Sequence, residues 1–165
     1  MTILHQITPQ MVLPYKAVRL RALKDTPSAF GSTYLRESMF TDEEWDKRAG
    51  NLNGERAVGY LAFDGEEYCG IAMCFLDKVD LMKAHLLSMW VASENRRSGV
   101  GRLLVDAIVG WACGRGAHTL QLMVTSNNDS AMEFYRRNGF SFTGRTEPYP
   151  NDATVTEYEM SKTIL

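Results

Sequence analysis

Cysteine, net charge and long apolar runs are all scarce in this sequence. Its 165 residues include three cysteines, Cys69, Cys74 and Cys113, an odd number without the spacing of metal ligands. We therefore expect reduced, mostly buried thiols, no bound metal and a cytoplasmic protein.

No window approaches the roughly 18 apolar residues that a membrane helix needs. The segment Met1–His5 lacks the charged and apolar regions that open an export signal. A formal net charge of −2 offers no electrostatic reason for nucleic acid to be the main partner. A chain of 165 residues with 45% hydrophobic residues can bury a sizeable core. We expect one domain over residues 1–165, with neither a membrane nor nucleic acid as partner.

A site for a phosphate or pyrophosphate is predicted by the run Arg96-Arg97-Ser98-Gly99-Val100-Gly101-Arg102. Two glycines one residue apart allow a tight turn that exposes backbone N–H groups, and the following helix aims the positive end of its dipole at them. A P-loop is excluded because no Lys-Ser or Lys-Thr follows the second glycine. A Rossmann fingerprint is excluded because Leu104 and Val124 stand where it needs a glycine and an acidic residue.

The elements around this run alternate between strand and helix. His85–Val91 has the pattern of a buried strand, and apolar residues then recur at helical spacing over 100–114. A strand over 119–124 leads to Asn127, and a helix over 130–138 begins at Ser130-Ala-Met-Glu133, which has the spacing of a capping box.

Two segments together resemble the GNAT superfamily of acyl-CoA-dependent N-acyltransferases. The run Arg96-x-x-Gly99-x-Gly101 resembles motif A of that family, and Asn127 with Ala131, Phe134-Tyr135 and Gly139-Phe140 resembles motif B. Asn127 and Asn128 are both candidates for the motif asparagine. The resemblance covers residues 84 to 142 strongly and the flanks only by pattern. It implies an α/β fold with an α+β flavour, in which a mixed central sheet carries flanking helices and its parallel pair splays apart.

The flanking segments fit this architecture. We expect strands over 2–7, 56–64 and 69–77, with a hairpin turn at Asp64-Gly65, and a last pair near 141–146 and 155–162. Helices are expected over about 13–23, opened by Thr8-Pro9 or Pro14, over 30–39, and after the capping box Thr41–Glu44. Parallel pairing of 84–91 with 119–124 is what the crossover helix requires.

The resemblance implies acetyl-CoA as co-substrate and an N-acetyltransferase activity without a metal. The pyrophosphate would lie on the backbone of 97–102, and the pantetheine arm would pair with the exposed backbone of 89–91. The predicted cofactor-binding residues are Met89, Trp90, Val91, Arg96, Arg97, Ser98, Gly99, Val100, Gly101, Arg102, Asn127, Ala131 and Tyr135.

Catalysis requires an acid for the departing thiolate and an acceptor amine that has lost its proton. Tyr135 is the predicted acid, because a neutral tyrosine can hand its proton to the sulfur. His85 is a candidate base, since alternation would put its side chain on one face with Leu87, Met89 and Val91. Glu37 is an alternative base or cation anchor, and Phe30 is a candidate for the acceptor pocket.

Two functions remain open from the sequence. The first is acetyl transfer to a primary amine by direct attack in a ternary complex, since the cysteines match no nucleophile motif. The second is a domain of the same fold that binds acetyl-CoA for sensing, without turnover. A proton donor at Tyr135 favours the first. The amine acceptor, a small molecule or a protein, is not encoded in any recognisable motif, nor is the choice between monomer and homodimer.

Overall fold

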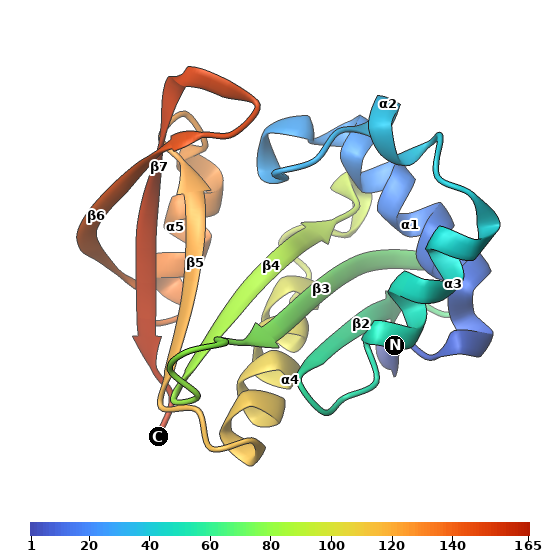
Figure 1. Ribbon diagram of the computed structural model, residues 1–165, viewed down its shortest axis with the longest axis horizontal. Coiled ribbons are helices and arrows are strands. Elements are labelled where there is room, and N and C mark those ends of the chain that lie inside the picture. Colours follow the sequence, from blue (N-terminus) through green and yellow to red (C-terminus); the bar gives the residue numbers. More distant parts are fainter.

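The computed structural model describes residues 1–165, whose centre is a seven-stranded mixed sheet (Figure 1). Its order is β1-β2-β3-β4-β5-β7-β6, and only β4 and β5 run parallel to each other. The strands are β1 (Ile3–Gln6), β2 (Ala57–Phe63), β3 (Tyr68–Leu76), β4 (Lys83–Val91), β5 (Thr119–Thr125), β6 (Ser141–Tyr149) and β7 (Asp152–Thr163).

Helices cover both faces of this sheet. Asp25 of the first helix bonds to Trp90 on one face, whereas Leu104 of the fourth lies against Gly70 on the other. The helices are α1 (Val12–Asp25), α2 (Tyr34–Glu37), α3 (Asp42–Asn51), α4 (Val100–Gly114) and α5 (Asp129–Arg137), with 3₁₀ turns η1 (Pro9–Met11), η2 (Pro27–Ala29) and η3 (Ser93–Asn95). None of these helices is long and apolar enough to cross a membrane.

Local sequence signals explain where several helices begin. At α3, the Thr41 hydroxyl accepts from the Glu44 N–H at 3.2 Å and the Glu44 carboxylate accepts from the Thr41 N–H at 3.0 Å, which confirms the predicted capping box. The bounds of α4 match the predicted 100–114, with one apolar face buried against the sheet. Pro9 opens η1, and Pro14 lies in the first turn of α1.

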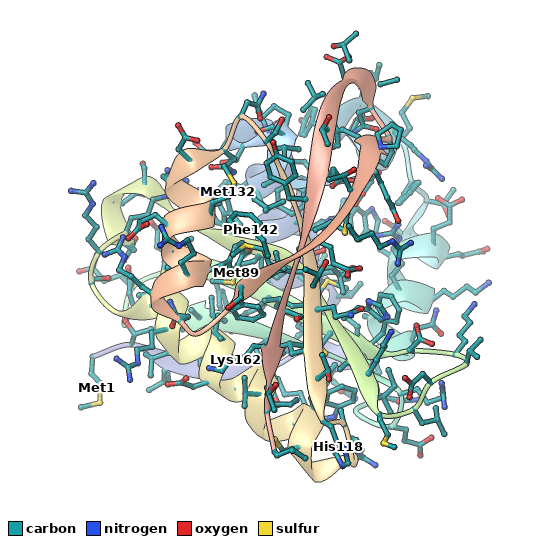
Figure 2. The ribbon with its side chains drawn as sticks, turned by 90° about the vertical axis from the view of Figure 1, so that its left-hand side faces the viewer. Met1, Met89, His118, Met132, Phe142 and Lys162 are labelled. Atoms are coloured by element: carbon teal, nitrogen blue, oxygen red, sulfur yellow. The ribbon has the colours of Figure 1, made fainter.

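Two predicted elements differ from the structure. The helix expected over 30–39 shrinks to Tyr34–Glu37, because Phe30 is extended and its carbonyl accepts hydrogen bonds from the β6–β7 hairpin. That hairpin is longer than predicted and twists beside α5 (Figure 2). Cys69 and Cys74 are buried, as expected, whereas Cys113 is exposed.

Candidate active site

The parallel strands β4 and β5 separate after a short paired segment. Their pairing comprises Lys83 with Thr119, Ala84 with Leu120 and His85 with Gln121, and no pair follows. The two strands visibly diverge beyond that point (Figure 1). The β5-facing edge of β4 from 86 to 91 therefore has no strand beside it, as the family resemblance implied, and its backbone can pair with an extended ligand.

A bulge in β4 sets the direction of the side chains at this gap. Ser88 has a left-handed φ of 56°, and the register to β3 shifts by one residue there. Beyond the bulge, Trp90 points to Asp25 on the α1 side, while the Met89 methyl lies next to α4. The shift overturns the expected alternation, because His85 shares a face with Leu87 and Trp90 rather than with Met89 and Val91.

The N-terminus of α4 exposes the predicted phosphate site. Gly99 caps the helix with φ 92°, and Arg97 just before it has φ 62°. The backbone N–H groups of residues 97–102 donate to no acceptor in the protein. Unpaired donors at the positive end of a long helix dipole favour an anionic ligand.

Gly101 has a different role from the one that its place in the motif suggests. A Cβ built there would lie 2.8 Å from the ring of Phe134 and 3.4 Å from the Met89 methyl. Gly101 therefore allows α4 to approach α5 and β4 closely. A larger residue would disturb this packing before it reached a phosphate, so substitution here does not test the phosphate site.

The three arginines of the run differ in their partners. Arg96 donates to Asp25 at 2.9 Å and to the Val91 carbonyl at 2.8 Å, so it ties the end of β4 to α1 instead of facing the α4 terminus. Hydrogen bonds from Trp90 and Thr26, together with the charge of Arg96, hold the pKa of Asp25 below its usual value. Arg97 and Arg102 are exposed, and Arg102 has only a loose contact with Asp106 at 3.9 Å. These two remain available to an anion.

Tyr135 is buried on α5 between two aromatic rings. Its ring centroid lies 5.4 Å from that of Phe134 and 5.6 Å from that of Phe140, both edge-on, and the residue is 8% exposed. Burial raises the pKa of its hydroxyl above the usual range. Tyr135 therefore stays protonated at physiological pH, as a proton donor must.

The two candidate asparagines have separate positions. Asn128 caps α5, where its side-chain oxygen accepts from the Ala131 N–H at 3.2 Å. The helix is thus capped two residues before Ser130, where the capping box was predicted. Asn127 instead lines a cavity on the α1 side of the sheet.

A buried ion pair holds the bulge of β4 from that side. Arg19 on α1 donates to both oxygens of Glu37, at 3.0 and 2.9 Å, and to the Ser88 hydroxyl at 2.6 Å. Burial opposes ionisation of Glu37, which is 0% exposed, but the hydrogen bonds and charge of Arg19 outweigh it and hold its pKa below the usual value. Glu37 was expected as a base or cation anchor, and this pairing removes it from contact with a substrate.

The position of Phe30 also differs from the one expected, which was in an acceptor pocket. Its ring is 4% exposed and lies under the Arg19 guanidinium, 4.9 Å from ring centroid to Cζ. The Phe30 carbonyl accepts from the Tyr149 hydroxyl at 2.7 Å and from the Asn151 amide at 3.2 Å. These bonds join the loop after α1 to the tip of the β6–β7 hairpin.

That junction borders a half-open cavity of about 260 Å³ beside the C-terminal end of β5. The residues that line it belong to the loop after α1, the end of β5 and the tip of the β6–β7 hairpin. The cavity lies on the opposite side of the sheet from α4. Most of its lining residues have polar side chains, although the atoms that face the cavity are mainly apolar, and none is lysine or arginine: Pro27, Ser28, Ser32, Thr33, Thr125, Asn127, Tyr149, Asn151, Asp152 and Val155.

His85 lies at the joined end of the parallel pair, away from the open end. Its Nε2 is 2.8 Å from Asp77, and its ring stacks on Phe75 with centroids 4.8 Å apart. Backbone hydrogen bonds within 77–80 and the contact with His85 hold the pKa of Asp77 well below its usual value. The imidazole thus has a structural partner before any substrate binds.

Sequence reasoning missed the residues that form and support this cavity. Arg19, Thr125, Tyr149 and Asn151 belong to no recognisable motif. One signal was present in β7, where Glu157 and Glu159 are two residues apart and so share one face of a half-buried strand. No group of three or more His, Cys, Asp and Glu residues is arranged to hold a metal ion.

Comparison with known proteins agrees with this architecture. Residues 20–140 match the model of the acetyltransferase (GNAT) family, and the chain belongs to that family. It resembles the probable N-acetyltransferase san of Drosophila melanogaster, with 27% identity over 110 residues, which make up 62% of this chain and 60% of that protein. The aligned region thus spans less than two thirds of this relative.

Solved structures share the fold across the whole chain. A GNAT acetyltransferase from Streptococcus pneumoniae superimposes with a TM-score of 0.82 at 21% identity, and all of both chains is covered. The PaiA N-acetyltransferase of Thermoplasma acidophilum, solved in complex with coenzyme A, gives a TM-score of 0.70 at 15% identity over 99% of each chain.

Proposed function

We propose that this protein transfers the acetyl group of acetyl-CoA to a primary amine by direct attack in a ternary complex. The observation that carries the proposal is the gap between β4 and β5, which has the unpaired N–H groups of residues 97–102 on one side of the sheet and the cavity lined by Thr125 and Asp152 on the other. The two substrates would thus approach the gap from opposite faces. Acetyl-CoA supplies the thioester from which the acetyl group is taken.

Each part of the site would hold one part of the cofactor. The amides of 97–102, with Arg97 and Arg102 beside them, would bind the pyrophosphate. The free edge of β4 would pair with the amide-bearing pantetheine arm, although the Val91 carbonyl is already engaged by Arg96. Tyr135 would donate its proton to the departing sulfur.

Direct attack agrees with the state of the cysteines. Burial raises the pKa of Cys74 to about 12, and burial together with the charge of Asp64 also raises that of Cys69. Neither thiol forms a thiolate readily, so neither is suited to carry a covalent acetyl group. The proposal treats residues 1–165 as one domain, because the cavity walls come from both ends of the chain.

The test is turnover with a panel of amines. Purified protein is mixed with acetyl-CoA and, separately, with 1,4-diaminobutane, lysine, an aminoglycoside and a peptide with a free N-terminus. We expect release of CoA thiol together with an N-acetylated amine, identified by mass spectrometry. Tight binding of acetyl-CoA without any acetylated amine would favour the sensing function instead, and products acetylated only on oxygen would overturn the substrate class.

A further inference from the structure

The acceptor side of β5 and β7 carries a row of carboxylates next to the cavity. Thr125 on β5 pairs directly with Glu157 on β7, and Met123 pairs with Glu159. Val155 lines the cavity together with Thr125, and alternation places Glu157 on the same face as Val155. Glu157 therefore lies beside the cavity, at the open end of the gap.

Glu157 differs from its acidic neighbours because it has no partner. Glu147, directly opposite on β6, binds Arg145 at 2.7 Å. Glu159 is 8% exposed and accepts from Thr143 at 2.9 Å and from Arg145 at 3.4 Å. Glu157 accepts no hydrogen bond and forms no ion pair, although it is half-buried. Burial, and then the charge of Glu147, raise its pKa above the usual value.

A second, independent observation comes from Thr125. Its side chain is 3% exposed and lines the cavity, yet its hydroxyl has no hydrogen-bond partner. Buried hydroxyls are nearly always bonded, because an unpaired one costs free energy. An unpaired hydroxyl next to an unpaired carboxylate fits a ligand that donates more than one N–H, which is the chemistry of an ammonium group.

The other candidate bases are already engaged. Glu37 is fully buried against Arg19, and His85 is bound to Asp77 at the joined end of the strands. Asp152, which lines the cavity, accepts hydrogen bonds from Thr154, whereas the Glu157 carboxylate next to the cavity has no partner within the protein.

We propose that Glu157, assisted by the Thr125 hydroxyl, binds the ammonium group of the acceptor and accepts its proton. The inference rests on the proposed function. Glu157 takes one proton from the ammonium, and the nitrogen lone pair then forms the C–N bond to the acetyl carbon. The C–S bond breaks, its electron pair stays on sulfur, and sulfur takes the Tyr135 proton. The second proton lost by nitrogen restores Tyr135 through solvent, and Glu157 releases its own proton to water.

The same residues define the acceptor class. Asp152 lines the cavity, and hydrogen bonds from Thr154 lower its pKa, so it is a carboxylate at neutral pH. No cationic side chain lines the cavity to hold an anionic acceptor. The site therefore suits a small cationic amine.

The test compares Glu157→Gln with Glu147→Gln, which removes the same charge from the opposite residue. With the best amine of the panel above, we expect Glu157→Gln to lower kcat/KM by about 10²–10⁴-fold at pH 7. Its affinity for acetyl-CoA, measured by calorimetry, should not change. Its Tm should equal or exceed that of the native protein, since it relieves the repulsion from Glu147. Glu147→Gln should change kcat/KM less than about threefold, within the range of an exposed charge.

The pH dependence of kcat/KM distinguishes a base from a residue that only supports the structure, because loss of structural support would not shift its acid limb. The charged groups around Glu157 are Glu147 and Arg145 on β6, Glu159 on β7 and Asp152 at the hairpin tip; its β5 neighbours Thr125 and Met123 are neutral. Removing Glu147 lowers the Glu157 pKa, so the acid limb of kcat/KM should move to lower pH. Thr125→Val should raise KM for the amine while leaving kcat within about threefold.

The outcomes separate the inference from the proposed function. A folded Glu157→Gln protein with native kcat/KM between pH 6 and 9 would overturn the inference while amine acetylation stands. Equal losses in Glu157→Gln and Glu147→Gln would also overturn it, because they would indicate a general effect of charge. A native protein that acetylates no amine would overturn the proposed function and the inference with it.

Discussion

Arg19 donates a hydrogen bond to the Ser88 hydroxyl over 2.6 Å, and this contact joins α1 to the residue of β4 that adopts a left-handed backbone. The two residues are 69 positions apart in the chain. The bulge at Ser88 sends Trp90 to one face of the sheet and Met89 to the other. The Arg19–Glu37 pair thus fixes the strand edge at which both substrates would meet.

Arg19→Met should destabilise the protein strongly. It leaves the Glu37 carboxylate buried with only Arg48 nearby, at 3.5 Å, and breaking a buried pair from one side typically costs about 3–5 kcal/mol. The double variant Arg19→Met with Glu37→Met should lose less than the single variant. Urea denaturation measures both changes in the free energy of unfolding. A single variant within about 1 kcal/mol of the native protein would contradict this account.

The same pair predicts how stability depends on pH. The folded pKa of Glu37 lies below its usual 4.5, so the stability it contributes is complete above pH 4.5 and is lost as pH falls through the folded value. In Glu37→Gln this part of the acid dependence should disappear. Denaturation midpoints measured between pH 3 and 6 would show the difference, and parallel curves for the two proteins would argue against it.

Tyr135→Phe should lower kcat by about 10²–10⁴-fold and leave acetyl-CoA affinity nearly unchanged. The substitution keeps the ring that packs between Phe134 and Phe140. Because burial raises the Tyr135 pKa, the native acid stays protonated through pH 9 and should impose no alkaline limb below that value. Single-turnover kinetics separate chemistry from product release. Native single-turnover rates in the variant would contradict a proton-donating role and leave Tyr135 with a packing role only.

Arg102→Glu should weaken acetyl-CoA binding by about tenfold or more, in a salt-dependent manner. The side chain is 79% exposed at the start of α4, so folding should be unaffected. Arg115→Glu is the matched control, because it makes the same charge change just after the other end of the same helix. Calorimetry at two salt concentrations tests the pair. Similar losses for both variants would contradict a phosphate site at residues 97–102.

His85→Ala should leave kcat within about threefold, unlike the variants at Tyr135 and Glu157. Its expected effect is on acid stability, because the imidazole contributes to the lowered Asp77 pKa. A carboxylate with a lowered folded pKa contributes stability above its usual 3.8 that is lost as pH falls below it, and the variant should lose this contribution. A rate loss of about 10²-fold, largest at low pH, would restore His85 as the base.

Much of the fold was predictable because its signals are local. Helical periodicity and flanking glycines predicted α4. The capping-box spacing from Thr41 to Glu44 predicted the start of α3. The family resemblance supplied the divergence of β4 and β5. The two helices depend on neighbours in the chain, and therefore a sequence pattern predicts them, whereas the divergence of the strands was expected from the resemblance alone.

The site was less predictable because distant contacts decide it. Nothing in the residues around Ser88 predicts a bulge, since serine has no preference for a left-handed backbone and the bond that holds it comes from α1. Arg96 belongs to a phosphate motif by sequence, yet Asp25 at the end of α1 engages it. One wall of the cavity depends on the hydrogen bond between Tyr149 and Phe30, which are 119 positions apart in the chain.

The short paired segment between β4 and β5 also affects how the molecule unfolds. Within the sheet, strands β1–β4 are joined to strands β5–β7 only by the residue pairs at Lys83, Ala84 and His85. We expect the backbone hydrogen bonds on the two sides of this segment to open more independently in the free protein than those within one side, although both sides share one hydrophobic core. A ligand that pairs along the open edge of β4 adds hydrogen bonds where the chain has none. Binding should therefore strengthen the link between the two sides, with a higher Tm and slower amide exchange on both sides of the gap.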